Sequence, residues 1–172
     1  MYILDTLAKE HSKKNTLAIV AYIGDDPERF KELLNVFALG NTKLIQRAAW
    51  PLSYVAELQP WLVQPQLAFI CKLLDKPLHV AVKRNVMRLL QNFNIPNKLM
   101  GIVTDKCFEF LTDKNETIAV KAFSMMVLYH ICLKEPDLKN ELIPILEDLL
   151  PYGTPGLKSR CKKILAALYK IS

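Results

Sequence analysis

Glycine is scarce in this sequence, with only five residues in 172. All-β folds rich in tight turns need more glycine, and so do the loops that hold nucleotide phosphates. Long hydrophobic runs are also missing, since no stretch approaches 18 apolar residues without a charge or a helix breaker. What is present is 51% hydrophobic and 23% charged residues, which excludes intrinsic disorder and suffices for one buried core. We therefore expect a helical globular protein.

The sequence also lacks the signals of secretion and of metal binding. No basic segment followed by an apolar run opens the chain, so we expect no signal peptide and a cytoplasmic location. The histidines have no ligand partner at helical spacing, and no Cys-x-x-Cys pair occurs. We expect no metal, no cofactor and no membrane anchor. Four widely separated cysteines lie within apolar helical patterns and should be reduced core thiols: Cys71, Cys107, Cys132 and Cys161.

Apolar residues recur every three to four positions along nearly the whole chain, which predicts helices. Helix starts are indicated by capping residues or prolines at Asp26, Asn115, Glu135 and Thr154. Pro51 should kink the helix that contains it. The predicted helices are residues 2–12, 15–24, 27–39, 42–58, 64–75, 78–93, 98–112, 116–134, 137–150 and 155–170.

The second helices of the four later pairs repeat one pattern. Their anchor residues Ile45, Val82, Val120 and Leu157 lie 37, 38 and 37 residues apart. Positions four, seven and eleven after each anchor share the anchor's helix face, so we expect one buried stripe per helix. The stripe residues after the anchors are Ala49, Val86, Ser124 and Cys161 at four, Leu52, Leu89, Val127 and Ile164 at seven, and Ala56, Phe93, Ile131 and Leu168 at eleven.

The turn and second helix of the better copies, Leu73-Leu74-Asp75 to Val82-Lys83 and Leu111-Thr112-Asp113 to Val120-Lys121, resemble HEAT and armadillo repeats. The resemblance covers residues 27–170. It implies an all-α, right-handed superhelix of about five helical hairpins, with a concave face built from the second helices. We expect a single domain over residues 1–172, in which residues 1–25 form an atypical N-terminal capping hairpin and residues 27–170 form four repeats.

The face opposite the stripe lies two, five, six and nine positions after each anchor. It mixes aromatic, methionine and basic residues and contains no acid. One interpretation is that these side chains pack against neighbouring helices, as methionines and aromatics at helical spacing usually do. The other is a partner-binding surface, with the following candidate residues: Arg47, Trp50, Tyr54, Arg84, Met87, Arg88, Gln91, Met125, Tyr129 and Lys162.

Two functions follow from a repeat fold with a basic surface. The favoured hypothesis is a non-enzymatic scaffold that binds a protein or peptide of acidic character. The sequence contains no catalytic motif, and arginine forms strong bidentate hydrogen bonds with carboxylates. The alternative is DNA binding, because HEAT-like folds include alkylation-repair glycosylases and the chain has a formal charge of +6. Glycosylase chemistry calls for a carboxylate beside aromatic residues, and only Glu57, near Trp50 and Trp61, qualifies. The oligomeric state stays open.

Overall fold

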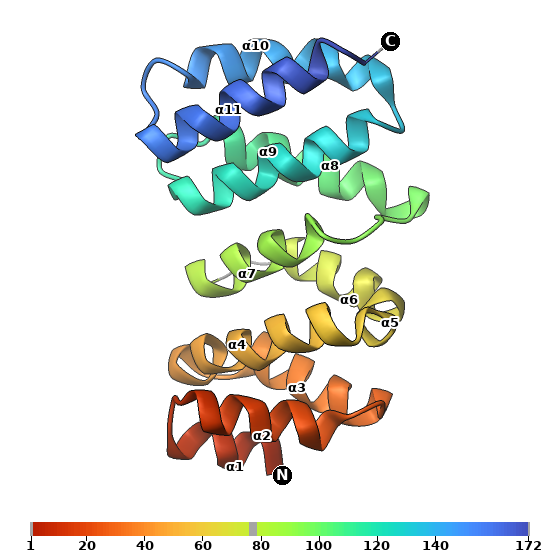
Figure 1. Cartoon of the computed structure of the whole chain (residues 1–172), viewed down its shortest axis with the longest axis vertical. Helices are drawn as coiled ribbons and strands as arrows, with labels where there is room; N and C mark the ends of the chain where they lie inside the picture. The colour runs from red at the N-terminus through yellow and green to blue at the C-terminus, as the bar shows by residue number, and fades with distance from the viewer. Residues whose placement is uncertain (1, 76–78, 172) are drawn as a thin grey trace. The chain divides into compact units, whose positions relative to one another are not determined.

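The structure, a computed structural model, describes residues 2–75 and 79–171, and these residues form helices and no β-strand. The predicted all-α class is therefore confirmed. The chain divides into two compact units, unit 1 (Met1–Leu89) and unit 2 (Leu90–Ser172). Figure 1 shows unit 1 from red to yellow-green and unit 2 from green to blue. The organisation of both units as one domain stays a prediction.

Unit 1 begins with α1 (Tyr2–Lys9), α2 (Lys13–Ile23), α3 (Pro27–Leu39) and α4 (Thr42–Leu58). The helix α4 packs on α1, α2 and α3. The hairpin of α1 and α2 lies where the capping hairpin was expected. Shorter segments follow, and α7 ends at the boundary between the units; the segments are α5 (Pro60–Val63), η1 (Gln64–Gln66), α6 (Leu67–Lys72), η2 (Leu73–Asp75) and α7 (Val80–Leu90).

Unit 2 contains α8 (Asn97–Thr112), α9 (Ile118–Cys132), η3 (Pro136–Leu138), α10 (Lys139–Leu149) and α11 (Pro155–Leu168). The helix α9 is central to this unit, because it packs on α8, α10 and α11. The helix α11 packs on α9 and α10. None of the helices in the described part of the chain is long and apolar enough to cross a membrane.

The buried stripe predicted from the repeat is confirmed. All four anchors are buried, and so are all residues four and seven positions after them. At position eleven, Ile131 and Leu168 are buried while Ala56 and Phe93 are half-buried. Since the same helix face is buried in each copy, the pattern of 37 and 38 residues reflects repeated packing.

Most helix boundaries agree with the predictions to within three residues, and the larger differences have identifiable reasons. The segment predicted as one helix over 64–75 is divided into η1, α6 and η2. Pro65, which lacks the N–H that a continuous helix needs, lies in η1. The start of α9 is capped by Thr117, whose side chain accepts a hydrogen bond from the Val120 N–H, and not by Asn115. Glu135 makes no side-chain cap to η3. Residue 78 of the predicted helix 78–93 lies outside the described residues.

The predicted caps at Asp26 and Thr154 are present in the structure, and the four cysteines are buried as predicted. Asp26 accepts from the N–H groups of Glu28 and Arg29, and Thr154 accepts from the N–H of Leu157. The helix α4 continues through Pro51. All four cysteines are free thiols in the core. Burial raises the pKa of the Cys71 and Cys132 thiols to about 11, so both are neutral at physiological pH.

Candidate partner-binding surfaces

Arg47, the first of the predicted binding residues, is engaged within unit 1. Its Nη1 donates hydrogen bonds of 2.6 Å to the carbonyl oxygen of Leu7 and 3.0 Å to that of Ala8. These carbonyls lie in the last turn of α1, where no helical N–H is available to them and the helix dipole is negative. Arg47 therefore links α4 to the N-terminal hairpin through these hydrogen bonds, and its guanidinium contributes to the stability of the fold.

Trp50 and Tyr54 lie one turn apart on α4, and both are half-buried. The ring of Trp50 is covered in part by His11, with the ring centroids 5.2 Å apart. His11 lies in the segment that joins α1 to α2. The α4 face is thus partly closed by the N-terminal hairpin, which supports the packing interpretation for Trp50.

The predicted residues of α7 differ sharply in exposure. Arg84 and Arg88 are exposed and lie one turn apart, while the Met87 side chain is completely buried. The expectation that Met87 faces a partner is therefore wrong. A residue five positions after the anchor lies away from the predicted stripe, so its burial shows that α7 is covered on more than one side.

In unit 2, Met125 on α9 is also completely buried. It cannot form part of an open surface, because α9 has packed neighbours in α8, α10 and α11. Tyr129 on the same helix is half-buried, and Lys162 on α11 is exposed. Of the residues predicted on α9 and α11, Tyr129 and Lys162 remain accessible.

A cavity of about 420 Å³ opens between the C-terminal halves of α9 and α11, and we name it the α9–α11 groove. Tyr129 is the one predicted binding residue that lines it. Two lysines and no carboxylate stand among its lining residues, which are Tyr129, Leu133, Lys163, Ala166, Ala167, Lys170 and Ile171.

Sequence reasoning missed most of this groove. Lys163 and Ala166 occupy positions six and nine of the predicted face, although they were not among the candidate binding residues. Leu133 and Lys170 lie thirteen positions after their anchors, beyond the last position that the repeat pattern used. Their shared place in two copies is the signal that could have found them.

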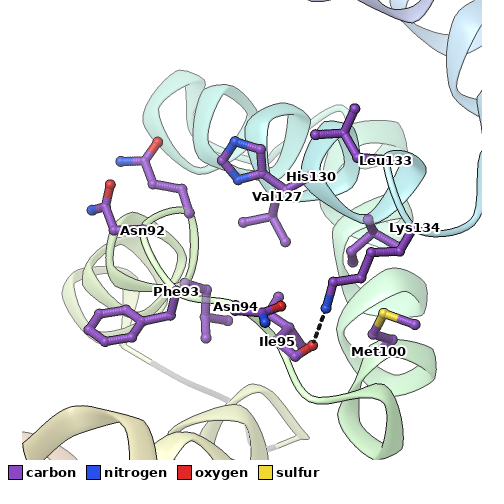
Figure 2. A pocket seen from close by; sticks show the side chains of 12 residues that line it. Asn92, Phe93, Asn94, Ile95, Met100, Val127, His130, Leu133 and Lys134 are labelled. Carbon is purple, nitrogen blue, oxygen red and sulfur yellow. Dashed lines mark hydrogen bonds between the residues drawn. The ribbon is translucent and has the colours of Figure 1, made fainter. Parts of the chain in front are cut away.

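Gln91 lines a separate, smaller cavity of about 290 Å³ between residues 90–95 and the end of α9. Figure 2 shows Val127 and His130 of α9 on one side of this cavity and Asn94 and Ile95 on the other. Lys134 Nζ donates a hydrogen bond of 2.9 Å to the Ile95 carbonyl oxygen, so the one lysine in the wall is already engaged (Figure 2).

Three basic side chains bond to main-chain oxygens about one repeat earlier in the chain. Arg47 reaches back 39 and 40 residues, Lys134 reaches back 39, and Arg160 Nη1 reaches back 38 to the Ala122 oxygen at 3.3 Å. Part of the positive charge therefore holds successive repeats together, which weakens its value as a sign of nucleic-acid binding.

The residues required for glycosylase chemistry do not form an enclosed site. Glu57 and Trp61 are exposed, and Trp50 is half-buried against His11. Within residues 2–75 and 79–171, no group of three or more His, Cys, Asp or Glu side chains is arranged to hold a metal ion.

The repeat packing agrees with a comparison with protein families, in which the HEAT repeat domain matches residues 3–168. The chain belongs to the HEAT repeat family. The resemblance seen in the sequence is thus confirmed. HEAT repeats are typically helical scaffolds that present extended surfaces to other proteins. No curated protein and no solved structure matches the chain.

Proposed function

We propose that this HEAT repeat chain is a non-enzymatic scaffold that binds an acidic peptide segment of a partner protein in the α9–α11 groove. The observation that carries the proposal is the composition of the groove wall. Lys163 and Lys170 stand beside an apolar floor and the half-buried ring of Tyr129, with no carboxylate among the lining residues.

The two lysines are available to a ligand. Lys163 and Lys170 are exposed, and in the described part of the chain their side chains form no hydrogen bond or ion pair. A partner carboxylate would form charge-assisted hydrogen bonds with their ammonium groups. Lysines at a groove rim also attract acidic segments before contact and so raise the association rate.

The apolar part of the groove would bind a neighbouring side chain of the same segment. Leu133 and Ile171, with Ala166 and Ala167 between the lysines, offer a floor without polar side chains. A volume of about 420 Å³ lies within the range of pockets that hold small ligands, which suits one or two peptide side chains. The preferred segment therefore alternates acidic and aliphatic residues.

A fluorescence anisotropy titration of the full chain with a short fluorescein-labelled peptide of glutamate and leucine tests the proposal. The double variant Lys163→Glu with Lys170→Glu should weaken binding by at least about tenfold, since each tenfold step corresponds to about 1.4 kcal/mol. The matched control is Lys13→Glu with Lys14→Glu, which makes the same charge change on the exposed start of α2 in unit 1.

The proposal is supported if the groove variant loses binding and the control keeps it within about twofold. Equal losses in both variants would mean that net charge alone attracts the peptide, and the groove assignment would be wrong. A labelled DNA duplex at low and high salt forms the third arm. Binding of duplex that exceeds peptide binding and falls steeply with salt would favour the nucleic-acid alternative over the scaffold.

A further inference from the structure

Unit 2 carries a larger cavity beside the first turns of α9 and α11, away from the C-terminal halves that form the α9–α11 groove. Its volume is about 580 Å³. The turn after α8 and the turn after α10 both line it, and these turns lie at the same end of unit 2 (Figure 1). We name it the hairpin-end cavity.

Apolar side chains make up much of the cavity wall. Leu111 and Leu157 are buried and form its floor. Ile118 is exposed in the same wall, and the Tyr152 ring is 90% exposed. An apolar ligand that covered these side chains would remove their surface from water, which is favourable.

Lys121 indicates the charge of the ligand. It lines the same cavity, although the residue is only 9% exposed. Within residues 2–75 and 79–171, its ammonium forms no hydrogen bond and no ion pair. Lys121 is also the fourth residue of α9, near the positive end of the helix dipole, where a cation is disfavoured. The fold therefore provides no partner for this ammonium, and an anion in the cavity would provide one.

The other charged residues of the wall favour an anion with a single charge. Glu116 is buried, and its Oε1 accepts hydrogen bonds from the N–H of Thr117 at 2.7 Å and from the Thr117 hydroxyl at 3.3 Å. Lys114 and Asp148 line the cavity and are exposed. The four charged side chains of the wall sum to zero, so a nucleic acid or another polyanion gains no net attraction there.

The uncharged part of the ligand must suit a wall with few free polar side chains. The Thr112 hydroxyl donates to main-chain oxygens of its own helix, and the Thr154 hydroxyl caps α11. Apart from the Tyr152 hydroxyl, no other uncharged polar side chain lines the cavity. A peptide would bring main-chain amides that need partners, and leaving them unpaired is unfavourable. A hydrocarbon chain has no such requirement.

We propose that the hairpin-end cavity binds an aliphatic monocarboxylate of the medium-chain fatty acid class. The carboxylate would pair with the Lys121 ammonium, and the chain would lie on Leu111, Ile118 and Leu157. A volume of about 580 Å³ lies within the range of small-ligand sites. The proposal does not depend on the α9–α11 groove, because the two cavities share no lining residue.

Isothermal titration calorimetry of the full chain with octanoate tests the proposal. The comparison ligand is 1-octanol, which has the same chain length and no charge. We expect octanoate to bind at least tenfold more tightly than 1-octanol. Heptanoate should bind roughly two- to fourfold more weakly than octanoate, because it buries one methylene fewer.

The variant Lys121→Met removes the ammonium and keeps a side chain of similar length. It should weaken octanoate binding at least tenfold and change 1-octanol binding less than twofold. The matched control is Lys162→Met on the exposed face of α11, which should change octanoate binding less than twofold. Since methionine is apolar, Lys121→Met should melt at or above the temperature of the original chain, and octanoate should raise the Tm of the original chain alone.

Equal affinity for octanoate and 1-octanol, or equal losses in Lys121→Met and Lys162→Met, would overturn the proposal. A short peptide that ends in two leucines forms the last arm. If it binds more tightly than octanoate and loses that affinity when its C-terminus is amidated, the occupant is the C-terminus of a partner protein, and the fatty acid assignment is wrong.

Discussion

The helices α9 and α11 occupy equivalent places in consecutive repeats, yet they differ in the face opposite their buried stripe. On α11 the four residues of this face are all exposed, whereas on α9 they are buried or half-buried. The difference follows from packing, since α9 has neighbours on more sides than α11 within unit 2. The composition of the two faces matches their burial, since the α9 face is largely apolar and the α11 face is largely polar. The residues are Ala122, Met125, Met126 and Tyr129 on α9, and Ser159, Lys162, Lys163 and Ala166 on α11. The place of a helix in the unit therefore decides which of its repeat positions are exposed at the surface.

Exchanging the residue types at position five should give the largest difference between the two helices in the free energy of unfolding. Met125→Lys places an unpaired ammonium in a completely buried site, so we expect a loss of about 3–5 kcal/mol in the free energy of unfolding. Lys162→Met changes an exposed residue and should alter it by less than about 0.5 kcal/mol. Urea denaturation followed by circular dichroism measures both. Similar losses in the two variants would contradict the contrast in burial.

Thiol reactivity should show how well the end of α9 is shielded. Burial raises the Cys132 pKa from 9.0 to about 11, so its thiolate fraction near pH 8 should fall about 100-fold relative to the unfolded chain. Reaction with an aromatic disulfide reagent, in a variant that keeps only Cys132, should slow by at least that factor. The Cys161 pKa is also raised by burial, and its thiol donates to the Leu146 oxygen at 3.1 Å. A Cys132 that reacts as fast as it does in urea would contradict the shielding.

The same pKa shift has a consequence for stability. A raised thiol pKa means that the folded state favours the neutral thiol. The stabilisation is therefore complete below the unfolded pKa of 9.0 and is lost as the pH rises towards about 11. Replacing Cys132 by serine should reduce the loss of unfolding free energy between pH 9 and pH 11, measured by urea denaturation at each pH. The same pH dependence in the variant and in the original chain would contradict the contribution of the Cys132 thiol.

The helix caps should not distinguish α9 from α11, because capping is local. Thr117 and Thr154 each accept a hydrogen bond of 3.4 Å from the third residue of their helix. Thr117→Ala and Thr154→Ala should each lower the unfolding free energy by about 1 kcal/mol. Thermal or urea denaturation of both variants checks this expectation. A difference of several kcal/mol between them would show that a cap also carries tertiary contacts.

An effect of about the same size as that of the caps is expected from the hydrogen bond that joins the two helices. Arg160 on α11 donates to the Ala122 oxygen on α9 at 3.3 Å, and its guanidinium lies 6.0 Å from the Phe123 ring centre. The Arg160→Ala variant should lose about 0.5–1.5 kcal/mol of unfolding free energy. The neighbouring Lys162→Ala variant on the exposed face is the control and should lose less. Equal values would mean that the bond adds nothing measurable.

The sequence was sufficient for the helices and their buried faces, because both depend on local spacing. The bounds of α3 and α4 agree with their predictions, and the anchors Ile45 and Val120 are buried as expected. Over 64–75 the predicted helix is α-helical only at Leu67–Lys72, with a 3₁₀ turn at each end, and Pro65 lies in the first of these turns. It also missed Thr117, because Asn115 and Thr117 are both good capping residues and only the turn geometry selects between them.

The surfaces were less predictable because they depend on contacts between helices. The sequence places Met125 and Lys162 on equivalent positions, and only packing shows that one is closed and the other open.

The bonds made by Arg47, Lys134 and Arg160 place unequal demands on the two repeats that they join. Each side chain bonds to a main-chain oxygen about one repeat earlier, and every residue type presents such an oxygen. The accepting position can therefore change its side chain without losing the acceptor, while the donating position needs a long basic residue. Consecutive repeats in such a chain can diverge in sequence and still be joined in the same way.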